Sequence, residues 1–373
     1  MTRKPFRRVL VVEGLEDRQL MAGDVAAVIS GQVLTLTGDV LDNGITITGL
    51  SGQVQVTGFE QGGADSTVNG NHRVTFKNVR KVIVDLGLGD DALVVTNLNL
   101  TGSVTSLASV TSGVSATSSV TAVTPTSVAL AIQMGDGDDI VGLGQFDNTT
   151  GEIDPLTLLP ETLVDETVNA LLRPLSVSRD VTIDLGDGEN ILRATAVTIG
   201  GSLTLTAGVD DDSLRLESRG TFGVAGFLRG VAVGLATTIS SDDGDDELKL
   251  ERFSTKKGLN LSSGAGNNIV HLANVTVTQD TTISGGDGYD SIKLDGYSTR
   301  RLQLSADDGD DDVFVRNVRT TSTTTINGGA GDNIYYDLGG NAQIRSLRLL
   351  NFETIIGTQA TSKTISRVPA FSP

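Results

Sequence analysis

Gly286-Asp-Gly-Tyr-Asp290 is the stretch that decides the fold, because closely similar segments return along most of the chain. Nine segments share its pattern of glycine or aspartate residues ending in Asp or Asn, and they are Gly87 to Asp91, Gly135 to Asp139, Gly186 to Asn190, Gly208 to Asp212, Asp242 to Asp246, Gly264 to Asn268, Gly286 to Asp290, Asp307 to Asp311 and Gly329 to Asn333. Their last residues are separated by 48, 51, 22, 34, 22, 22, 21 and 22 positions. One turn sequence that returns about every 22 residues indicates a repeat protein.

Apolar and polar residues alternate on both sides of these turns, as at Leu302 and Leu304 before a turn and at Val313 and Val315 after it. This period of two is typical of half-buried strands. A unit of 22 residues has room for two or three short strands, but it cannot bury its apolar face alone. We therefore predict an all-β fold, a right-handed parallel β-helix or β-solenoid with coils of about 22 residues. An antiparallel sandwich, the alternative, does not explain the fixed interval.

The solenoid is predicted to span residues 85–360, with a tail at 361–373. Insertions are predicted near 100–128, 147–176 and 220–234. The intervals of 48 and 51 residues fit either one coil with a long excursion or two coils with a short one. Residues 26–84 alternate at irregular spacing and are predicted to form the first coils or a β-rich cap. Pro160 to Arg173 has apolar residues at helical spacing, with acidic residues early and Arg late, and predicts one short inserted helix.

The composition points away from several classes of partner and chemistry. A net charge of -18 disfavours binding to nucleic acid and to anionic membranes, and it favours cations as partners. The absence of cysteine excludes disulfides, thiol nucleophiles and Cys-ligated zinc. No window approaches the roughly 18 consecutive apolar residues of a membrane span. The protein is therefore predicted to have no membrane span.

Residues 1–25 have the character of an export signal, with a basic head followed by a short apolar run at Val9 to Val12. The segment Gly14-Leu-Glu-Asp-Arg-Gln-Leu-Met-Ala22 resembles the N-terminal LEDR signature of exported and surface proteins of planctomycete bacteria, with Met21 in place of the usual Leu. The resemblance implies an extracellular or cell-surface location. The alternative is a disordered basic tail on a cytosolic protein.

Residues Gly285 to Lys293 resemble the nonapeptide G-G-x-G-x-D-x-U-x of RTX-like, calcium-binding parallel β-rolls, and Gly328 to Tyr336 resembles it with Asn333 in place of Asp. In that family, aspartate carboxylates and backbone carbonyls of stacked turns bind calcium. The resemblance implies calcium as a ligand of this chain, with metal ligands Asp91, Asp139, Asp243, Asp246, Asp287, Asp290, Asp308, Asp310 and Asp311. Because only one motif occurs per coil of about 22 residues, the loading is predicted to be less dense than in a true β-roll.

Stacking in register also creates an electrostatic problem that is independent of any family. Two unit charges about 5 Å apart repel by about 3 kcal/mol at an effective dielectric constant of 20. A row of aspartates therefore needs either cations or neutral amides, and Asn does occupy positions 190, 268 and 333. Calcium between successive turns and a metal-free ladder of Asn and Asp side chains both remain open.

No motif of nucleophilic or zinc catalysis is present, and His72 and His271 are both predicted to be surface residues. We therefore predict a secreted or cell-surface structural or adhesive β-solenoid, not an enzyme, stabilised by calcium and with glycans or other surface proteins as partners. The alternative is a polysaccharide lyase or hydrolase, because such folds carry carbohydrate-active grooves. A basic patch that would orient an acidic sugar, or balance the aspartate row, comprises Arg300, Arg301, Arg316 and Arg319.

Overall fold

A computed structural model of the chain describes residues 23–61, 64–101, 127–144, 175–218, 230–341 and 343–357. Every regular element within these ranges is a strand, and the strands form three long stacked sheets, so the predicted all-β parallel solenoid is confirmed. The LEDR-like segment, the predicted helix at Pro160 to Arg173 and the tail at 361–373 lie outside the described residues.

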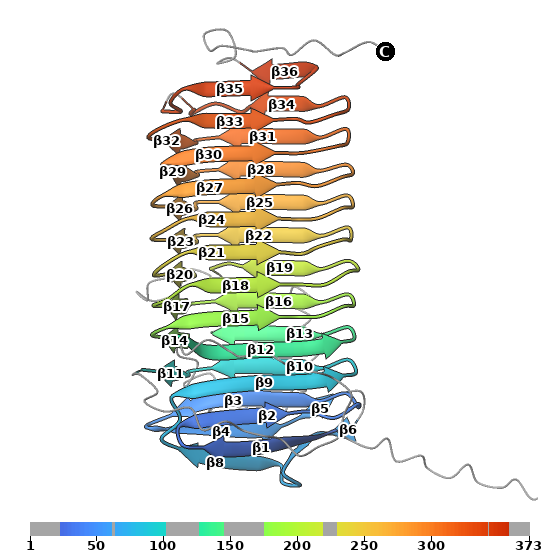
Figure 1. The fold of residues 1–373 in the computed structure, drawn as a ribbon, viewed down its shortest axis with the longest axis vertical. Coiled ribbons are helices and arrows are strands. Elements are labelled where there is room, and N and C mark those ends of the chain that lie inside the picture. Colours follow the sequence, from blue (N-terminus) through green and yellow to red (C-terminus); the bar gives the residue numbers. More distant parts are fainter. Residues whose placement is uncertain are drawn as a thin grey trace, which may run out of the picture.

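A regular coil of the solenoid contains three strands, one in each of three sheets, and this arrangement repeats from β9 to β32 (Figure 1). In one regular coil, β27 (Asp280–Ser284) leads through the Gly-Asp turn into β28 (Ser291–Asp295), and β29 (Ser298–Thr299) closes the coil. The next coil then begins with β30 (Arg301–Ser305). We call the sheets that contain β27, β28 and β29 the first, second and third sheet.

The three sheets comprise 13, 13 and 8 strands. In spatial order, the first sheet contains β35 (Leu347–Leu350), β33 (Thr324–Asn327), β30, β27, β24 (Leu259–Ser262), β21 (Thr237–Ser240), β18 (Leu203–Thr206), β15 (Asp180–Asp184), β12 (Val128–Asp136), β9 (Lys81–Leu88), β2 (Val33–Thr37), β1 (Asp24–Ser30) and β7 (Thr67–Val68). The second contains β36 (Thr354–Gly357), β34 (Ile334–Asp337), β31 (Asp312–Arg316), β28, β25 (Ile269–Ala273), β22 (Glu247–Glu251), β19 (Ser213–Leu216), β16 (Ile191–Thr195), β13 (Ile140–Gly144), β10 (Ala92–Thr96), β3 (Gly44–Leu50), β4 (Gln53–Gly58) and β8 (Arg73–Lys77). The third contains β11 (Asn99–Leu100), β14 (Leu175–Val177), β17 (Val197–Ile199), β20 (Ala232–Val233), β23 (Ser254–Thr255), β26 (Thr276–Val277), β29 and β32 (Arg319–Thr320), and β5 (Glu60–Gln61) pairs separately with β6 (Ala64–Asp65).

The core is a narrow column of aliphatic side chains enclosed by the three sheets. The strands of the regular coils pair in register, so that Leu272, Leu294 and Val315 lie one above another, and all three are fully buried. Burying one such side chain stabilises the fold by about 1.5 to 3 kcal/mol. Because each coil buries its apolar face only against its neighbours, the stability of one coil depends on the next.

The two long intervals in the repeat each contain a single coil. Strand β10 pairs directly with β13, and β13 pairs directly with β16, so no further coil lies between them. Residues 102–126 and 145–174, within these two intervals, lie outside the described residues. Residues 219–229 do so as well, and β20 follows them inside the range predicted as the third insertion.

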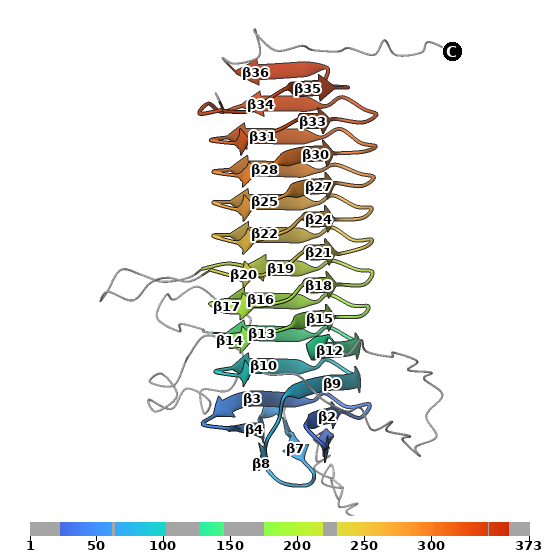
Figure 2. The ribbon, with the colours of Figure 1, turned by 60° about the vertical axis from the view of Figure 1, so that its left-hand side comes forward.

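Antiparallel pairs close the N-terminal end of the stack. Among the strands that extend the three sheets, β1 pairs antiparallel with β2, β3 with β4, and β4 with β8, whereas the pairs between successive coils are parallel. Figure 2 shows β4, β7 and β8 at this end and β35 and β36 at the other. Such a cap covers strand edges that would otherwise pair with another chain. No helix in the described ranges is long and apolar enough to cross a membrane.

Candidate functional site

The Gly-Asp turns connect the first sheet to the second and stack directly on one another. Gly286 and Gly288 adopt left-handed backbone conformations, with φ of +102° and +127°. A Cβ atom on Gly286 would lie 1.6 Å from the carbonyl oxygen of Gly264 in the preceding coil. Glycine is therefore required both for the turn and for the close approach of successive coils.

The last residue of each turn forms a buried column, which we call the inner column. Its members are Asn43, Asp91, Asp139, Asn190, Asp212, Asp246, Asn268, Asp290, Asp311 and Asn333. None is more than 2% exposed. Burial of this many charged or amide groups is unusual and requires that each find a polar partner.

A continuous hydrogen-bond ladder satisfies one side-chain oxygen of these residues. The Oδ1 atom of each residue from Asp91 onward accepts the backbone N–H of the inner-column residue one coil earlier, at 2.6 to 3.0 Å. At the last coil, Oε2 of Glu353 takes this role and accepts the N–H of Asn333 at 2.7 Å. The ladder therefore links ten turns from Asn43 to Asn333 and ends on a carboxylate.

We call a coil an Asn coil or an Asp coil according to its inner-column residue. The two kinds of coil differ in the second polar atom of that side chain. In the Asn coils this atom is an amide nitrogen, and Nδ2 of Asn190 donates to the carbonyl oxygens of Gly186 and Gly188 at 3.1 and 2.9 Å. In the Asp coils the equivalent atom is a carboxyl oxygen, which cannot donate when the group is ionised. The Oδ2 atoms of all six inner-column aspartates are buried without a hydrogen-bond partner.

The environment of these carboxyl groups disfavours their charged form. Burial raises the pKa of Asp246 to about 6 and the pKa values of Asp91 and Asp290 to about 7. Burial likewise raises the pKa of Asp311 to about 7 and the pKa values of Asp139 and Asp212 to about 8, and neighbouring aspartates add to the effect in each case. At neutral pH these carboxyl groups are therefore fully ionised only where a cation or a hydrogen-bond donor compensates their charge.

The residue just before each inner-column residue lies on the solvent side of the turn, and we call this row the outer column. Here the ladder runs in the opposite direction, so that Oδ1 of Asp310 accepts the N–H of Asp332 in the following coil at 2.8 Å. Oδ1 of Asp245 accepts the N–H of Asn267 in the same way at 2.6 Å. These carboxylates are exposed, and water can solvate their remaining oxygens.

The structure divides the predicted metal ligands into two groups. Five of them belong to the buried inner column and are Asp91, Asp139, Asp246, Asp290 and Asp311. Four are exposed and are Asp243, Asp287, Asp308 and Asp310. The prediction omitted Asp212, Asn43 and Glu353. Asn43 had a sequence signal, because it precedes Asp91 by the same 48 residues that separate Asp91 from Asp139, whereas Glu353 follows a segment without the glycine pattern.

Oxygen atoms suitable for calcium lie at the Asp coils of the inner column. Within the described part of the chain, no three acidic or histidine side chains converge as a ligand set. A cation would therefore need backbone oxygens as well, and calcium accepts six to eight oxygen ligands from carboxylates, carbonyls and water. The unpartnered Oδ2 atoms fit calcium by their chemistry. The Asn coils do not fit, because an amide N–H already occupies the turn carbonyls.

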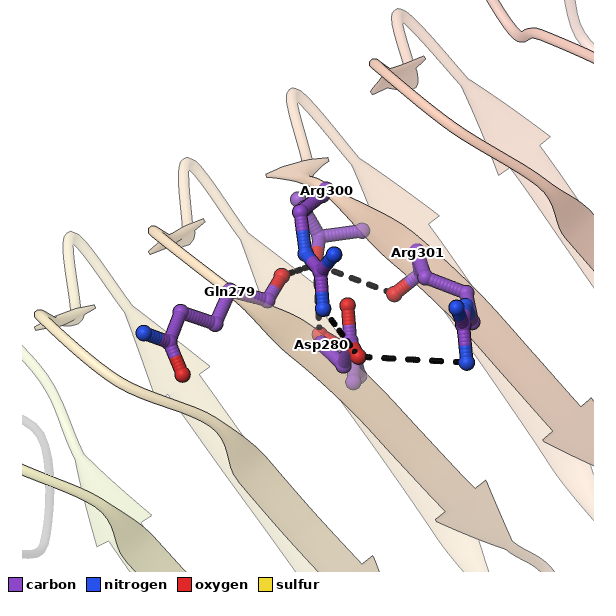
Figure 3. Close-up of polar contacts among 6 residues, drawn as sticks. Gln279, Asp280, Arg300 and Arg301 are labelled. Atoms are coloured by element: carbon purple, nitrogen blue, oxygen red, sulfur yellow. Dashed lines mark hydrogen bonds and ion pairs between the residues drawn. The ribbon is translucent and has the colours of Figure 1, made fainter.

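The predicted basic patch is balanced by carboxylates outside the turn columns. Nη2 of Arg300 lies 2.6 Å from Oδ2 of Asp280, and Nη1 of Arg301 lies 4.0 Å from the same atom, so that both arginines converge on one carboxylate (Figure 3). Nε of Arg316 donates to Oδ1 of Asp295 at 2.9 Å. Asp280 begins β27 and Asp295 ends β28, so these three arginines balance strand-end charges, whereas no ion pair is found for Arg319 among the described residues.

The two histidines lie where the alternation predicts, at the surface. His72 is exposed in a bend. His271 points outward from β25 between Lys249 and Lys293 of the neighbouring strands, and it is half-buried. Burial, together with the two lysine charges, lowers the pKa of His271.

No family model, curated protein or solved structure matches this chain. The interpretation of the site below rests on its geometry and chemistry.

Proposed function

We propose that this protein is a secreted or cell-surface structural solenoid whose stacked turns are stabilised by calcium. The N-terminal resemblance to exported planctomycete proteins supports the location. The continuous core, the paired strands and the turn ladder support a rod-like structural role, because backbone hydrogen bonds join successive coils along the described strands and turns.

The observation that carries the calcium part of the proposal is the set of six buried Oδ2 atoms without partners. An isolated carboxylate in the protein interior is costly unless a hydrogen-bond donor or a cation compensates it. The Asn coils have no such charge, and their amide nitrogen donates to turn carbonyls. A calcium ion would compensate the charge in the Asp coils, since calcium accepts both the carboxylate and the carbonyl oxygens as ligands.

One face of the rod supports an adhesive role toward uncharged glycans. Six outward side chains on successive strands of the first sheet pair in register, and they are Thr204, Thr238, Asn260, Thr282, Gln303 and Thr325. All are polar and uncharged, and none forms a side-chain hydrogen bond with another described residue. Such a row offers donors and acceptors to a neutral partner without the repulsion that the acidic chain exerts on polyanions.

Removing calcium is expected to lower the melting temperature of the purified protein. A ligand at 100 times its Kd stabilises the folded state by about 2.7 kcal/mol per site, provided that the unfolded chain does not bind it. Melting curves followed by circular dichroism, in excess EGTA and in millimolar calcium chloride, measure the effect. Magnesium chloride at the same concentration controls for ionic strength. Equal melting temperatures with EGTA and with calcium would contradict the calcium part of the proposal.

Surface location predicts that an antibody against the solenoid labels intact cells of the source organism. Treating intact cells with a protease before lysis should remove this labelling, while a cytosolic marker protein stays intact. If the solenoid is protected until the cells are lysed, the proposed location is wrong.

A further inference from the structure

The inner column has a regular order of Asn and Asp that extends along the whole ladder. From the N-terminal end, Asn43, Asn190 and Asn268 are each followed by two Asp, and Asn333 ends the column, so that the four Asn enclose three groups of two aspartates. The groups are Asp91 with Asp139, Asp212 with Asp246, and Asp290 with Asp311. Although the sequence intervals between these residues differ, the ladder places each pair in adjacent coils. The carboxylates of the column therefore occur in isolated pairs.

The three pairs share the same geometry. The N–H of the first aspartate donates to Oδ1 of the second, at 2.7, 2.8 and 2.9 Å in chain order. Both Oδ2 atoms of every pair are buried and lack a partner. Within each pair, the charge of one member also raises the pKa of the other, as Asp91 does for Asp139. Each pair thus forms one unit of two electrostatically coupled carboxyl groups.

The Asn coils separate these units. Oδ1 of Asn268 accepts the N–H of Asp246, which continues the ladder, while its Nδ2 donates to the carbonyl oxygens of Gly264, Gly266 and Gly285. An Asn coil therefore adds no charge, and its turn carbonyls already have a donor. Carboxylates of different pairs lie two strand spacings apart, about 9.6 Å, compared with about 4.8 Å within a pair.

From this arrangement we infer that the inner column contains three separate divalent-cation sites, one at each aspartate pair, and that each holds one calcium ion. This inference rests on the proposed calcium binding and adds the number of bound ions and the location of each. Two carboxylates balance one divalent ion, whereas a monovalent ion would leave each pair with an uncompensated charge. The remaining ligands are turn carbonyls and water, in keeping with the oxygen shell of calcium.

A second consequence concerns the exposed aspartates. Asp310 lies next to Asp311 in sequence, but its Oδ1 accepts the N–H of Asp332 and its side chain faces solvent. The outer column is not needed for the three sites. Asp310→Asn preserves the Oδ1 acceptor and removes one exposed charge, so it is a matched control for substitutions in the inner column.

The number of bound ions tests the inference on the full chain. Equilibrium dialysis against calcium chloride, with calcium measured by elemental analysis, is expected to give three ions per chain. Asp290→Asn should reduce the number to two, and the triple substitution Asp139→Asn, Asp246→Asn and Asp290→Asn should reduce it to zero. Asp310→Asn should leave three. Asn occurs naturally in the column and keeps its ladder hydrogen bond, so these variants are expected to fold, which circular dichroism checks.

Melting temperatures with and without calcium distinguish the loss of a calcium site from a general loss of stability. In EGTA, Asp290→Asn should melt at a higher temperature than the unsubstituted protein, because a buried charge is removed. Its melting temperature should rise by about one third less on adding calcium, since one of three sites is lost. A count other than three, or loss of an ion in Asp310→Asn, would overturn the inference while leaving calcium stabilisation intact. Complete absence of bound calcium in the folded protein would overturn both.

Discussion

Gly286→Ala is expected to destabilise the C-terminal coils by at least about 4 kcal/mol, a size reserved for severe backbone or core defects. An L-residue in a left-handed conformation costs about 1 to 2 kcal/mol. The greater part of the effect arises because the new Cβ would lie 1.6 Å from the carbonyl oxygen and 2.5 Å from the carbonyl carbon of Gly264. These are backbone atoms of the adjacent coil, and they cannot move without breaking the hydrogen bonds between coils.

A matched control separates the cost of the close contact with Gly264 from the cost of the left-handed backbone conformation. Gly31 also has a positive φ, +61°, but a Cβ there would meet no atom within 4 Å. Gly31→Ala should therefore cost only about 1 to 2 kcal/mol. Urea denaturation of both variants, followed by circular dichroism, measures the difference. If the two variants lose the same stability, close stacking of the turns does not limit the residue at position 286.

Asn268→Ala is expected to lower the free energy of unfolding by about 3 to 5 kcal/mol, measured in EGTA so that cations do not contribute. The substitution leaves the buried N–H of Asp246 without an acceptor and three turn carbonyls without the Nδ2 donor. Each buried polar group left unsatisfied costs about 1 to 3 kcal/mol. The ladder is also interrupted at its centre, so coils on either side should lose their mutual support.

The neighbouring Asn267 provides the control, because it makes a similar bond on the solvent side. Oδ1 of Asn267 accepts the N–H of Tyr289 at 3.0 Å, but the residue is exposed and water can replace the side chain. Asn267→Ala should cost less than about 1 kcal/mol. A loss as large as that of Asn268→Ala would show that burial does not distinguish the two ladders.

The fold was predictable because two independent patterns agree on it. The alternation at Leu302 and Leu304 identifies strands, and the return of the Gly-Asp turn every 21 or 22 residues requires that the strands stack. The number of strands per coil was left at two or three. Strands of the third sheet such as β26 contain only two residues, which is too short for a period of two to be recognised.

The candidate site was only partly predictable, because adjacent turn residues have opposite environments. Asp310 and Asp311 are chemically identical, yet one is exposed and the other fully buried. A shift of one position along an extended backbone reverses the side chain from solvent to interior, and composition does not reveal which is which. The glycine pattern located the turns, but Asn43 and Glu353 were missed because the segments that precede them lack glycine at the equivalent places.

The order of Asn and Asp in the inner column also limits how such a rod can change in length during evolution. Deleting one Asp coil would leave a single unpaired acid, and deleting one Asn coil would join two pairs into a run of four. Deletion or duplication of three successive coils preserves the order at every junction. The unit of length that preserves the proposed pairing is therefore three coils, about 14 Å of rod, although the turn sequence repeats in every coil.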